Sequence, residues 1–294
     1  GRLTIGSHHY SVQTQNRIVV VGAGKASARM AQALEYRLGA RIDRGLVVVK
    51  YGHGAPTKKI RIVEAGHPVP DAHGLQAGRA ILNLIRTLKP DDLLIVLLSG
   101  GASSLLPAPA PGMTLKDKQQ TTRLLLRSGA TIQEMNAVRK HLSQVKGGQL
   151  ASATAAPVAS LILSDVIGND LGTIGSGPTA PDPTTFREAW AILERYRVTT
   201  RIPASIRRRL RAGIDKTVAE TPKAGASLFR RVHNMLIGDN QAAVDAVAKA
   251  AKKEGLHRLI LSTTVTGEAR EIAKLFGAMA REIAARGRPV RRPC

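Results

Sequence analysis

One glycine turn in this sequence has the residue types of a phosphate-binding site. It reads Ser99, Gly100, Gly101, Ala102, Ser103 and Ser104, and it follows an apolar run at 93–98. Adjacent glycines let a backbone approach a ligand without interference from Cβ atoms, and amides exposed at such a turn attract anions. We therefore expect phosphate binding here, although a turn that only closes an α/β layer would have the same composition.

A second glycine turn, at Gly22 and Gly24, carries Lys25 at the start of the next helix. With Ser27 it nearly fits the dinucleotide fingerprint, but the following strand ends in Lys50, where a nicotinamide site needs an acid. It also lacks the Ser or Thr that follows the lysine of a Walker A loop. A helix N-terminus already carries positive partial charge, so Lys25 predicts an anion between the two.

Five more residues have the type and position of ligands. His67 and Asp71 lie in a proline-rich loop and are candidates for substrate contact, although Asp71 would also suit a helix cap. Lys146 precedes a Gly-Gly pair, where an ammonium can reach a phosphate, and Arg139 lies on a basic helix face that could equally be solvated. Asp165 follows an apolar strand, where α/β folds place metal or substrate ligands.

The apolar runs and helical periods that must position these residues predict an α/β fold. We expect a Rossmann-like, doubly wound, mainly parallel sheet in residues 1–230, followed by the start of a second, smaller α/β domain in 231–294. The expected strands are 17–24, 46–49, 61–65, 93–98, 158–163, 235–238 and 259–263. The expected helices are 25–38, 75–88, 115–128, 131–146, 185–195, 241–253 and 269–285.

The composition favours anionic partners. The 294 residues carry a formal net charge of +23, but aromatic residues make up only 3%, which leaves few platforms for stacking bases. A nucleic-acid-binding module is therefore an alternative that rests on charge alone. Cys294 is the single cysteine, and neither a signal peptide nor a run long enough to cross a membrane is visible. We expect a cytoplasmic protein, with a homodimer left open.

Several blocks together resemble the bacterial-type glycerate 2-kinase family with its MOFRL-type C-terminal domain. The blocks occur in the family's order and read VVVGAGKAS, AGHPVPD, LSGGASSL, NAVRKHLSQVKGGQLA, LSDVIGNDLGTIGSGPT and VTGEARE. The resemblance implies transfer of the ATP γ-phosphoryl group to the 2-hydroxyl of D-glycerate, with Mg²⁺. It implies that Lys25 is catalytic, that the 99–104 turn binds phosphates, and that Lys146, Asp165 and Asn169 lie in matching blocks. We assign Lys146 and Asn169 to nucleotide and Asp165 to metal.

Relatives in this family have also been labelled hydroxypyruvate reductases, so an NAD(P)-dependent reductase is the main alternative. The turn at Gly22 and Gly24, which nearly fits the dinucleotide fingerprint, is the sequence feature that favours it. The chain ends at Cys294, before the family's Gly-Gly-Arg-Asn motif with its catalytic arginine. By that comparison we expect this chain alone to be weakly active or inactive.

Overall fold

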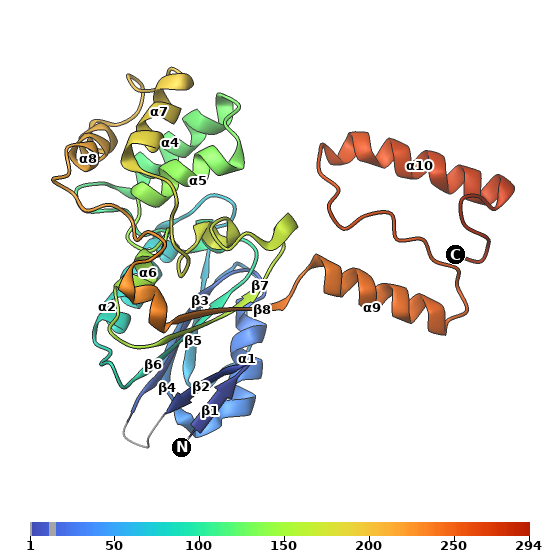
Figure 1. Ribbon diagram of the computed structural model, residues 1–294, viewed down its shortest axis with the longest axis horizontal. Helices are drawn as coiled ribbons and strands as arrows, with labels where there is room; N and C mark the ends of the chain where they lie inside the picture. The colour runs from blue at the N-terminus through green and yellow to red at the C-terminus, as the bar shows by residue number, and fades with distance from the viewer. Residues whose placement is uncertain (1, 12–15) are drawn as a thin grey trace. The chain divides into compact units, whose positions relative to one another are not determined.

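The computed structural model describes residues 2–11 and 16–294, and its main feature is a six-stranded sheet in the order β5-β4-β3-β6-β7-β8 (Figure 1). The strands are β3 (Ile18–Ala23), β4 (Ile42–Lys50), β5 (Ile60–Ala65), β6 (Leu93–Leu98), β7 (Val158–Leu163) and β8 (Val232–Gly238). The pairings from β5 through β7 are all parallel. In chain order this is the 3-2-1-4-5-6 arrangement of the doubly wound Rossmann fold, which confirms the predicted fold class.

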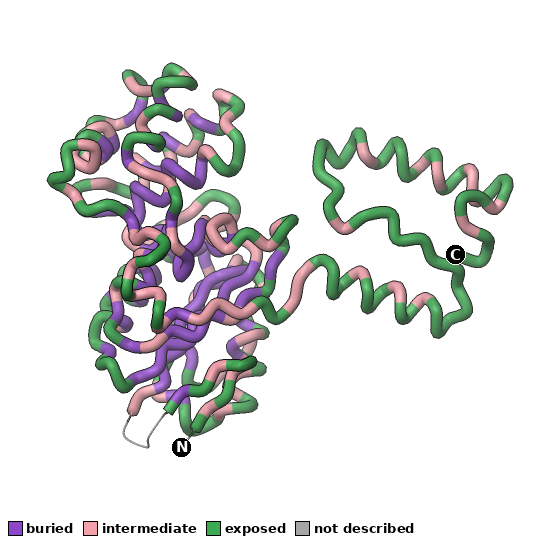
Figure 2. The backbone as a smooth tube through the Cα atoms, in the orientation of Figure 1, coloured by how far each residue is buried: buried purple, intermediate pink, exposed green. Residues whose placement is uncertain are grey.

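The two central strands, β3 and β6, are buried along their whole length, as Figure 2 shows. Continuous apolar runs are typical of parallel strands that are covered on both faces. After β3 the chain builds one half of the sheet outward to β5, and it then crosses over to β6, which begins the other half beside β3. The carboxyl ends of strands at such a crossover are where open α/β sheets bind ligands. Both glycine turns of the sequence lie at this point, directly after β3 and β6.

The helices form two groups within this part of the chain. Helix α1 (Ser27–Leu38) packs Ala28 and Ala31 against the sheet, and α2 (Ala72–Arg86) contacts β4 and β5. A separate helical core is built around Phe186 by α4 (Leu115–Arg127), α5 (Ile132–His141), α7 (Phe186–Arg195) and α8 (Ala204–Ile214). Short turns are α3 (Ala102–Leu105), α6 (Gln149–Ser152), η1 (Gly39–Arg41), η2 (Ile167–Asn169), η3 (Ile174–Ser176) and η4 (Ser227–Arg231).

A small antiparallel hairpin, β1 (Arg2–Ile5) with β2 (His8–Ser11), was not predicted from the sequence. Its Tyr10 is buried in the sheet core, and the Tyr10 hydroxyl lies 2.8 Å from Nδ1 of His233 on β8. Only alternate residues of such short strands are covered, so the apolar signal was too weak to identify them.

Three expected elements differ from the structure. The helix expected over 131–146 ends at His141, because the next residues bond to the 108–110 segment instead. The Gln144 amide donates to the Ala108 carbonyl, and the Ala110 amide donates to the Leu142 carbonyl. The strand expected at 235–238 to open a new domain is part of β8 and is instead the sixth strand of the main sheet. Residues 259–263 are not a strand, because they have no strand partner among the described residues.

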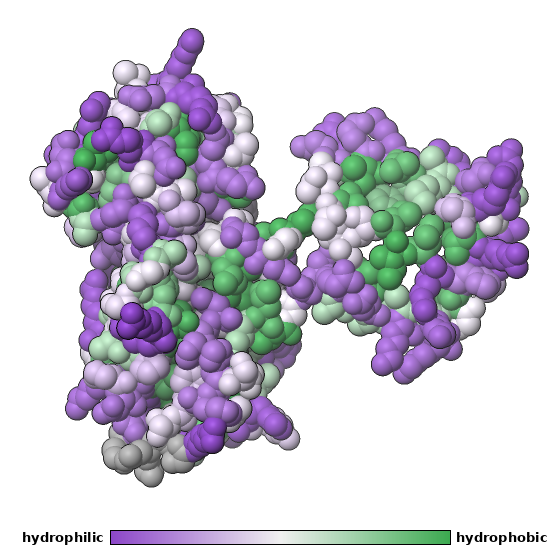
Figure 3. Space-filling view, viewed as in Figure 1, coloured by the Kyte–Doolittle hydropathy of each residue, from purple (hydrophilic) through white to green (hydrophobic). Residues whose placement is uncertain are grey.

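Contacts divide the chain into two compact units: Gly1–Ser164 with Asp170–Ile237, and Asp165–Asn169 with Gly238–Cys294. The second unit carries α9 (Asn240–Lys253) and α10 (Ala269–Arg286), and no residue from 238 to 294 is buried. Leu261, Leu275 and Phe276 of this unit are exposed, and Figure 3 shows hydrophobic side chains on its surface. The domain boundary after residue 230 stays a prediction. None of the described helices combines the length and hydropathy needed to cross a membrane.

Candidate functional site

The two glycine turns fit together at the carboxyl ends of β3 and β6. A Cβ atom on Gly22 would lie 2.3 Å from the carbonyl oxygen of Leu97, and one on Gly24 would lie 2.1 Å from Oγ of Ser99. Gly24 also has a φ of +141°, a conformation that L side chains rarely adopt. The Lys25 amide donates a 2.8 Å hydrogen bond to the carbonyl of Gly100. Glycine is therefore required at both positions by close packing between the turns.

The backbone amides of the first glycine turn, which follows β3, already donate hydrogen bonds within the protein. Those of Gly24 and Lys25 donate to the carbonyls of Val48 and Gly100, and that of Ser27 donates to the Gly24 carbonyl. The Ala26 amide donates to Oγ of Ser99 at 3.0 Å. Four consecutive amides are therefore satisfied within the protein. A dinucleotide-binding turn instead directs its amides at the pyrophosphate, so this turn is poorly suited to that role.

The second turn has amides to spare. The amides of Gly100, Gly101 and Ser103 donate to none of the described residues, whereas those of Ala102 and Ser104 bond back to the turn. Helix α3 is a single four-residue turn, and Gly101 precedes it with a φ of 91°. Three open amides around a left-handed residue form a concave cluster of donors that suits an anion.

The serine hydroxyls of this turn do not all face a ligand. Oγ of Ser99 is buried and lies 3.0 Å from Oγ of Ser27, which donates to the Leu97 carbonyl. The Ser104 hydroxyl donates to the carbonyl of Gly101 at 3.2 Å. Ser99 and Ser104 therefore brace the turn, and the open donors come from its backbone.

Lys25 and His67 meet over Gly101. A Cβ atom on Gly101 would lie 2.9 Å from Cδ2 of His67 and 3.5 Å from Cγ of Lys25. Lys25 is exposed, and its ammonium has no hydrogen-bond or ion-pair partner among the described residues. The fold thus brings together a free cation, an imidazole and the open amides, three features that lie far apart in the sequence.

Asp71 has a structural task. It caps α2 by accepting a 3.0 Å hydrogen bond from the Gly74 amide, and its second oxygen accepts from the Tyr51 hydroxyl at 2.7 Å. Burial alone would raise the pKa of Asp71, but these hydrogen bonds outweigh it and hold the pKa below its usual range. The carboxylate is therefore already engaged at the end of the loop that carries His67.

Lys146 is tied to the phosphate turn. Its buried ammonium donates to the carbonyl and to Oγ of Ser103, at 2.6 and 3.0 Å. Oγ of Ser103 lies 2.8 Å from that of Ser176, which donates to Oδ1 of Asn136 at 3.1 Å. Because the Ser176 proton is used there, Ser103 must donate to Ser176. This chain of hydrogen bonds links the turn that follows β6 to Asn136 in the middle of α5.

Two further cations lie close to Lys146. Burial and the charges of Lys118 and Arg139 hold the pKa of Lys146 well below its usual range. Burial and the charge of Arg139 lower the pKa of Lys118 to about 7, and burial lowers that of Arg139. Helices α4 and α5, which carry Lys118 and Arg139, are packed against each other in the helical core.

Sequence reasoning missed Lys118, Asn136 and Ser176. Lys118 lies on the buried face of α4 together with Thr121 and Leu125. A lysine at a position of the helix that faces the core was the signal in the sequence. Asn136 and Ser176 both lie inside blocks that were recognised, but only the tertiary structure joins them.

Asp165 and Asn169 belong to the second unit. Asn169 donates its side-chain amide to Oδ2 of Asp239, the cap of α9, at 2.7 Å. Asp165 is exposed. No group of three or more His, Cys, Asp or Glu side chains suited to a metal ion occurs in the described ranges. Because Mg²⁺ usually takes one or two carboxylates and completes its shell with water and phosphate oxygens, a lone carboxylate still fits its chemistry.

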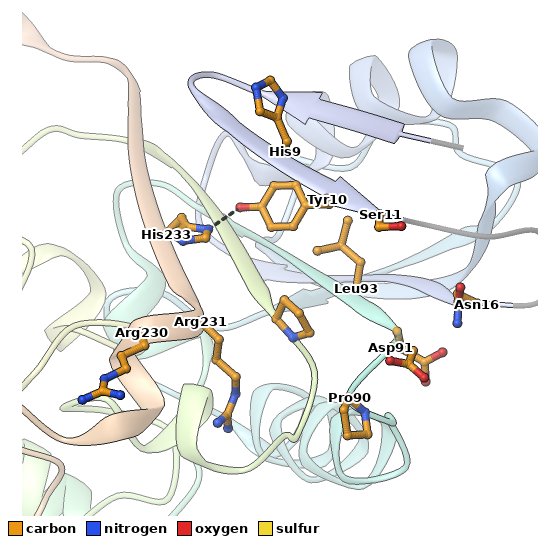
Figure 4. A pocket seen from close by; sticks show the side chains of 12 residues that line it. His9, Tyr10, Ser11, Asn16, Pro90, Asp91, Leu93, Arg230, Arg231 and His233 are labelled. Carbon is orange, nitrogen blue, oxygen red and sulfur yellow. Dashed lines mark hydrogen bonds between the residues drawn. The ribbon is translucent and has the colours of Figure 1, made fainter.

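A cavity of 540 Å³ lies at the amino ends of the strands, whereas the glycine turns lie at their carboxyl ends. Figure 4 shows the residues that line this cavity. Leu93 at the start of β6, Asp91 before it, and Tyr10 and His233 are among its lining residues. The amino ends of parallel strands are not where open α/β sheets bind ligands. We therefore place the candidate site at the interlocked turns.

Comparison with known proteins identifies the family of this chain and supports its fold. A family model described as a domain of unknown function, DUF4147, matches residues 2–211. A glycerate 2-kinase from Pyrococcus horikoshii is 40% identical over 96% of this chain and 63% of its own length. A D-glycerate 2-kinase from Thermotoga maritima is 40% identical over 95% of this chain and 64% of its own length. A putative hydroxypyruvate reductase from Agrobacterium vitis is 45% identical over 94% of this chain and 70% of its own length.

A crystal structure of a Thermotoga maritima glycerate kinase matches 95% of this chain and 65% of its own, with a TM-score of 0.80 and 40% identity. The chain thus spans just under two thirds of the length of these glycerate kinases. From the family match and the identities, the chain belongs to the DUF4147 family, whose relatives carry the glycerate kinase and hydroxypyruvate reductase names that the resemblance implied.

Proposed function

We propose that this chain is the Rossmann-like part of an ATP-dependent glycerate 2-kinase, which converts D-glycerate to 2-phosphoglycerate. The observation that carries the proposal is the second glycine turn. Its amides at 100, 101 and 103 are open, the Lys25 side chain lies beside Gly101, and the Lys146 ammonium contacts Ser103. Phosphoryl transfer requires positioning and cations around the transferring group rather than covalent chemistry by the protein. This turn supplies both requirements.

In the proposed reaction the 2-hydroxyl oxygen of glycerate bonds to the γ-phosphorus of ATP. The bond from that phosphorus to the bridging oxygen breaks, ADP leaves, and the hydroxyl proton passes to solvent or to a base. The open amides hold nucleotide phosphates. Lys25 balances the charge on the transferring phosphoryl group, for which its unpaired ammonium is suited. His67, over the same glycine, contacts the substrate.

The remaining assignments are also part of the proposal. Mg²⁺ would neutralise charge on the phosphates, with Asp165 as its protein ligand. Asn169 would bind the nucleotide, and Arg139 the anionic substrate. Gly22 and Gly24 act by letting the two turns approach, and Asp71 by fixing the loop of His67.

The experiment is an ADP-release assay with D-glycerate, ATP and Mg²⁺, on this chain and on a protein that carries it at the length of its relatives. The proposal expects turnover in the longer protein on the order of 1–100 s⁻¹, the range usual for kinases. Omission of D-glycerate is the control. ATP hydrolysis that is independent of D-glycerate, or no ADP release at all, would contradict it.

The alternative is an NAD(P)-dependent hydroxypyruvate reductase, which the name of the Agrobacterium relative favours. Two observations weigh against it: the amides from Gly24 to Ser27 are already used, and β4 ends in Lys50 rather than in an acid. NADH fluorescence titration separates the two functions. Tight NADH binding without ATP binding would favour the reductase.

A further inference from the structure

Lys118 is a buried cation for which the protein provides no partner. Its side chain is 8% exposed, and its Nζ atom forms no hydrogen bond with any of the described residues. Leaving a buried charge unpaired is among the most costly arrangements in a folded protein. Burial lowers the pKa of this amine to about 7, and an anion beside it would restore the charged form.

Its neighbours make the arrangement more costly. The charges close enough to act on Lys118 and Lys146 are cations in both cases, namely Arg139 for Lys118 and both Lys118 and Arg139 for Lys146. Lys146 has neutral acceptors only, both on Ser103. Nearby Lys140 shows the contrast, because its buried ammonium is paired with Asp182 at 3.2 Å.

The three cations come from separate segments of the chain. Lys118 lies on α4, Arg139 on α5, and Lys146 on the turn that follows α5. Lys146 contacts Ser103, and Gln119 beside Lys118 donates a 2.7 Å hydrogen bond to the carbonyl of Pro70 in the His67 loop. The cluster therefore adjoins the candidate site on the side of the helical core.

We infer that Lys118, Arg139 and Lys146 form one binding site for a small oxyanion, with Lys118 as its buried anchor. A carboxylate and a phosphate group share the required chemistry. In naming the ligand the inference rests on the proposed function: the source is either the carboxylate of glycerate or a phosphate of ATP. The arrangement lowers the stability of the empty protein in exchange for strong, charge-assisted binding when the anion enters.

The test uses Lys118→Met, which keeps the length of the side chain and removes its charge. Lys116→Met, an exposed lysine two residues earlier on the same helix, is the matched control. Thermal melting is measured without ligand and with D-glycerate, ATP or inorganic phosphate, each compared with KCl at equal ionic strength. Dissociation constants follow from titration calorimetry.

Without ligand, Lys118→Met is expected to melt at a higher temperature than the wild type, and Lys116→Met at the same temperature. The anion that occupies the site should bind Lys118→Met at least about tenfold more weakly, as for a lost charge-assisted hydrogen bond, and should bind Lys116→Met unchanged. Loss for D-glycerate alone assigns the carboxylate, and loss for ATP alone assigns a nucleotide phosphate. Weaker binding of inorganic phosphate alone would show an oxyanion site that takes neither glycerate nor ATP.

Equal affinity of wild type and Lys118→Met for all three anions, or no stabilisation of the wild type by any of them beyond KCl, would overturn the inference. If Lys118→Met does not fold, the same comparison is made with Lys118→Gln, and in the wild type the lysine ε-carbon NMR signal of Lys118 must shift on addition of anion. The ADP-release assay is independent of these readouts. Charge-dependent binding without turnover would therefore keep this site and reject the kinase.

Discussion

The ammonium of Lys146 donates to both the carbonyl and the hydroxyl of Ser103, at 2.6 and 3.0 Å, across 43 positions of sequence. This contact joins the turn after α5 to the turn after β6. It turns the Ser103 hydroxyl toward Ser176 and leaves the Ser103 amide open. A buried lysine is thus used to set the shape of a backbone site.

Lys146→Met is expected to raise the Michaelis constant for ATP about tenfold or more, because charge-assisted hydrogen bonds contribute about 1.5–3 kcal/mol. Steady-state kinetics on the longer protein measures the effect, with Lys116→Met as the control. An unchanged constant in a folded variant would show that the phosphate turn keeps its shape without Lys146.

Lys25→Ala should lower kcat about a hundredfold, since loss of a preorganised charge at the reacting group costs about 3 kcal/mol. Lys25→Arg should recover only part of it, because a guanidinium differs in reach and geometry. Lys59→Ala, at an exposed lysine outside the turns, is the control. Activity of Lys25→Ala within threefold of wild type would exclude the residue from the mechanism.

Gly101→Ala tests close approach at the phosphate turn. Gly101 and Gly112 have φ of +91° and +79°, so alanine is strained at both, but only at Gly101 would its Cβ meet other atoms, at 2.9 Å from the His67 ring. Both variants should lose about 1 kcal/mol of stability or somewhat more. Only Gly101→Ala should weaken ATP binding, by calorimetry. Equal ATP affinity of the two variants would make the turn purely structural.

Glu220 predicts a pH dependence of stability. Burial would raise its pKa, but hydrogen bonds from His141, Phe186 and Thr221 lower it to about 2, below the ordinary 4.5. The folded state therefore favours the carboxylate. This contribution is fully present above pH 4.5 and is lost as the pH falls toward 2.

Glu220→Gln should cost about 1–3 kcal/mol at pH 7, where His141 and Phe186 lose a charged acceptor. The difference from wild type should shrink below pH 4. Urea unfolding across this range measures both, with the exposed Glu254→Gln as the control. A stability difference that stays constant down to pH 2.5 would contradict the assignment of the lowered pKa to Glu220.

Limited trypsin digestion should cut the second unit before the first. No residue from 238 to 294 is buried, and segments with few buried apolar contacts open most readily. Early cleavage is expected near Lys252 and Arg258, leaving the sheet and the helical core intact. Mass spectrometry of the first fragments identifies the sites, and first cuts within 16–237 would contradict this expectation.

The sequence by itself determined the α/β fold class and the positions of the two glycine turns. The apolar runs of β3 and β6 can be buried only when both faces are covered, and each run leads into a glycine turn that is visible in the sequence. Lys25 was visible because a cation at a helix start is unfavourable without an anion. Each of these signals depends only on residues that are neighbours in the sequence, so it can be read without the tertiary structure.

Tertiary structure alone decided which donors remain open. The four amides from Gly24 to Ser27 are used by contacts with β4, with the turn after β6 and with Gly24 itself, whereas the amides at 100, 101 and 103 stay open. The helix expected to continue to Lys146 ends at His141, which allows that lysine to reach Ser103. Lys118 became a site residue only through burial against cations from other segments. Hydrogen-bond partners and desolvation depend on atoms far away in sequence, so no local pattern could specify them.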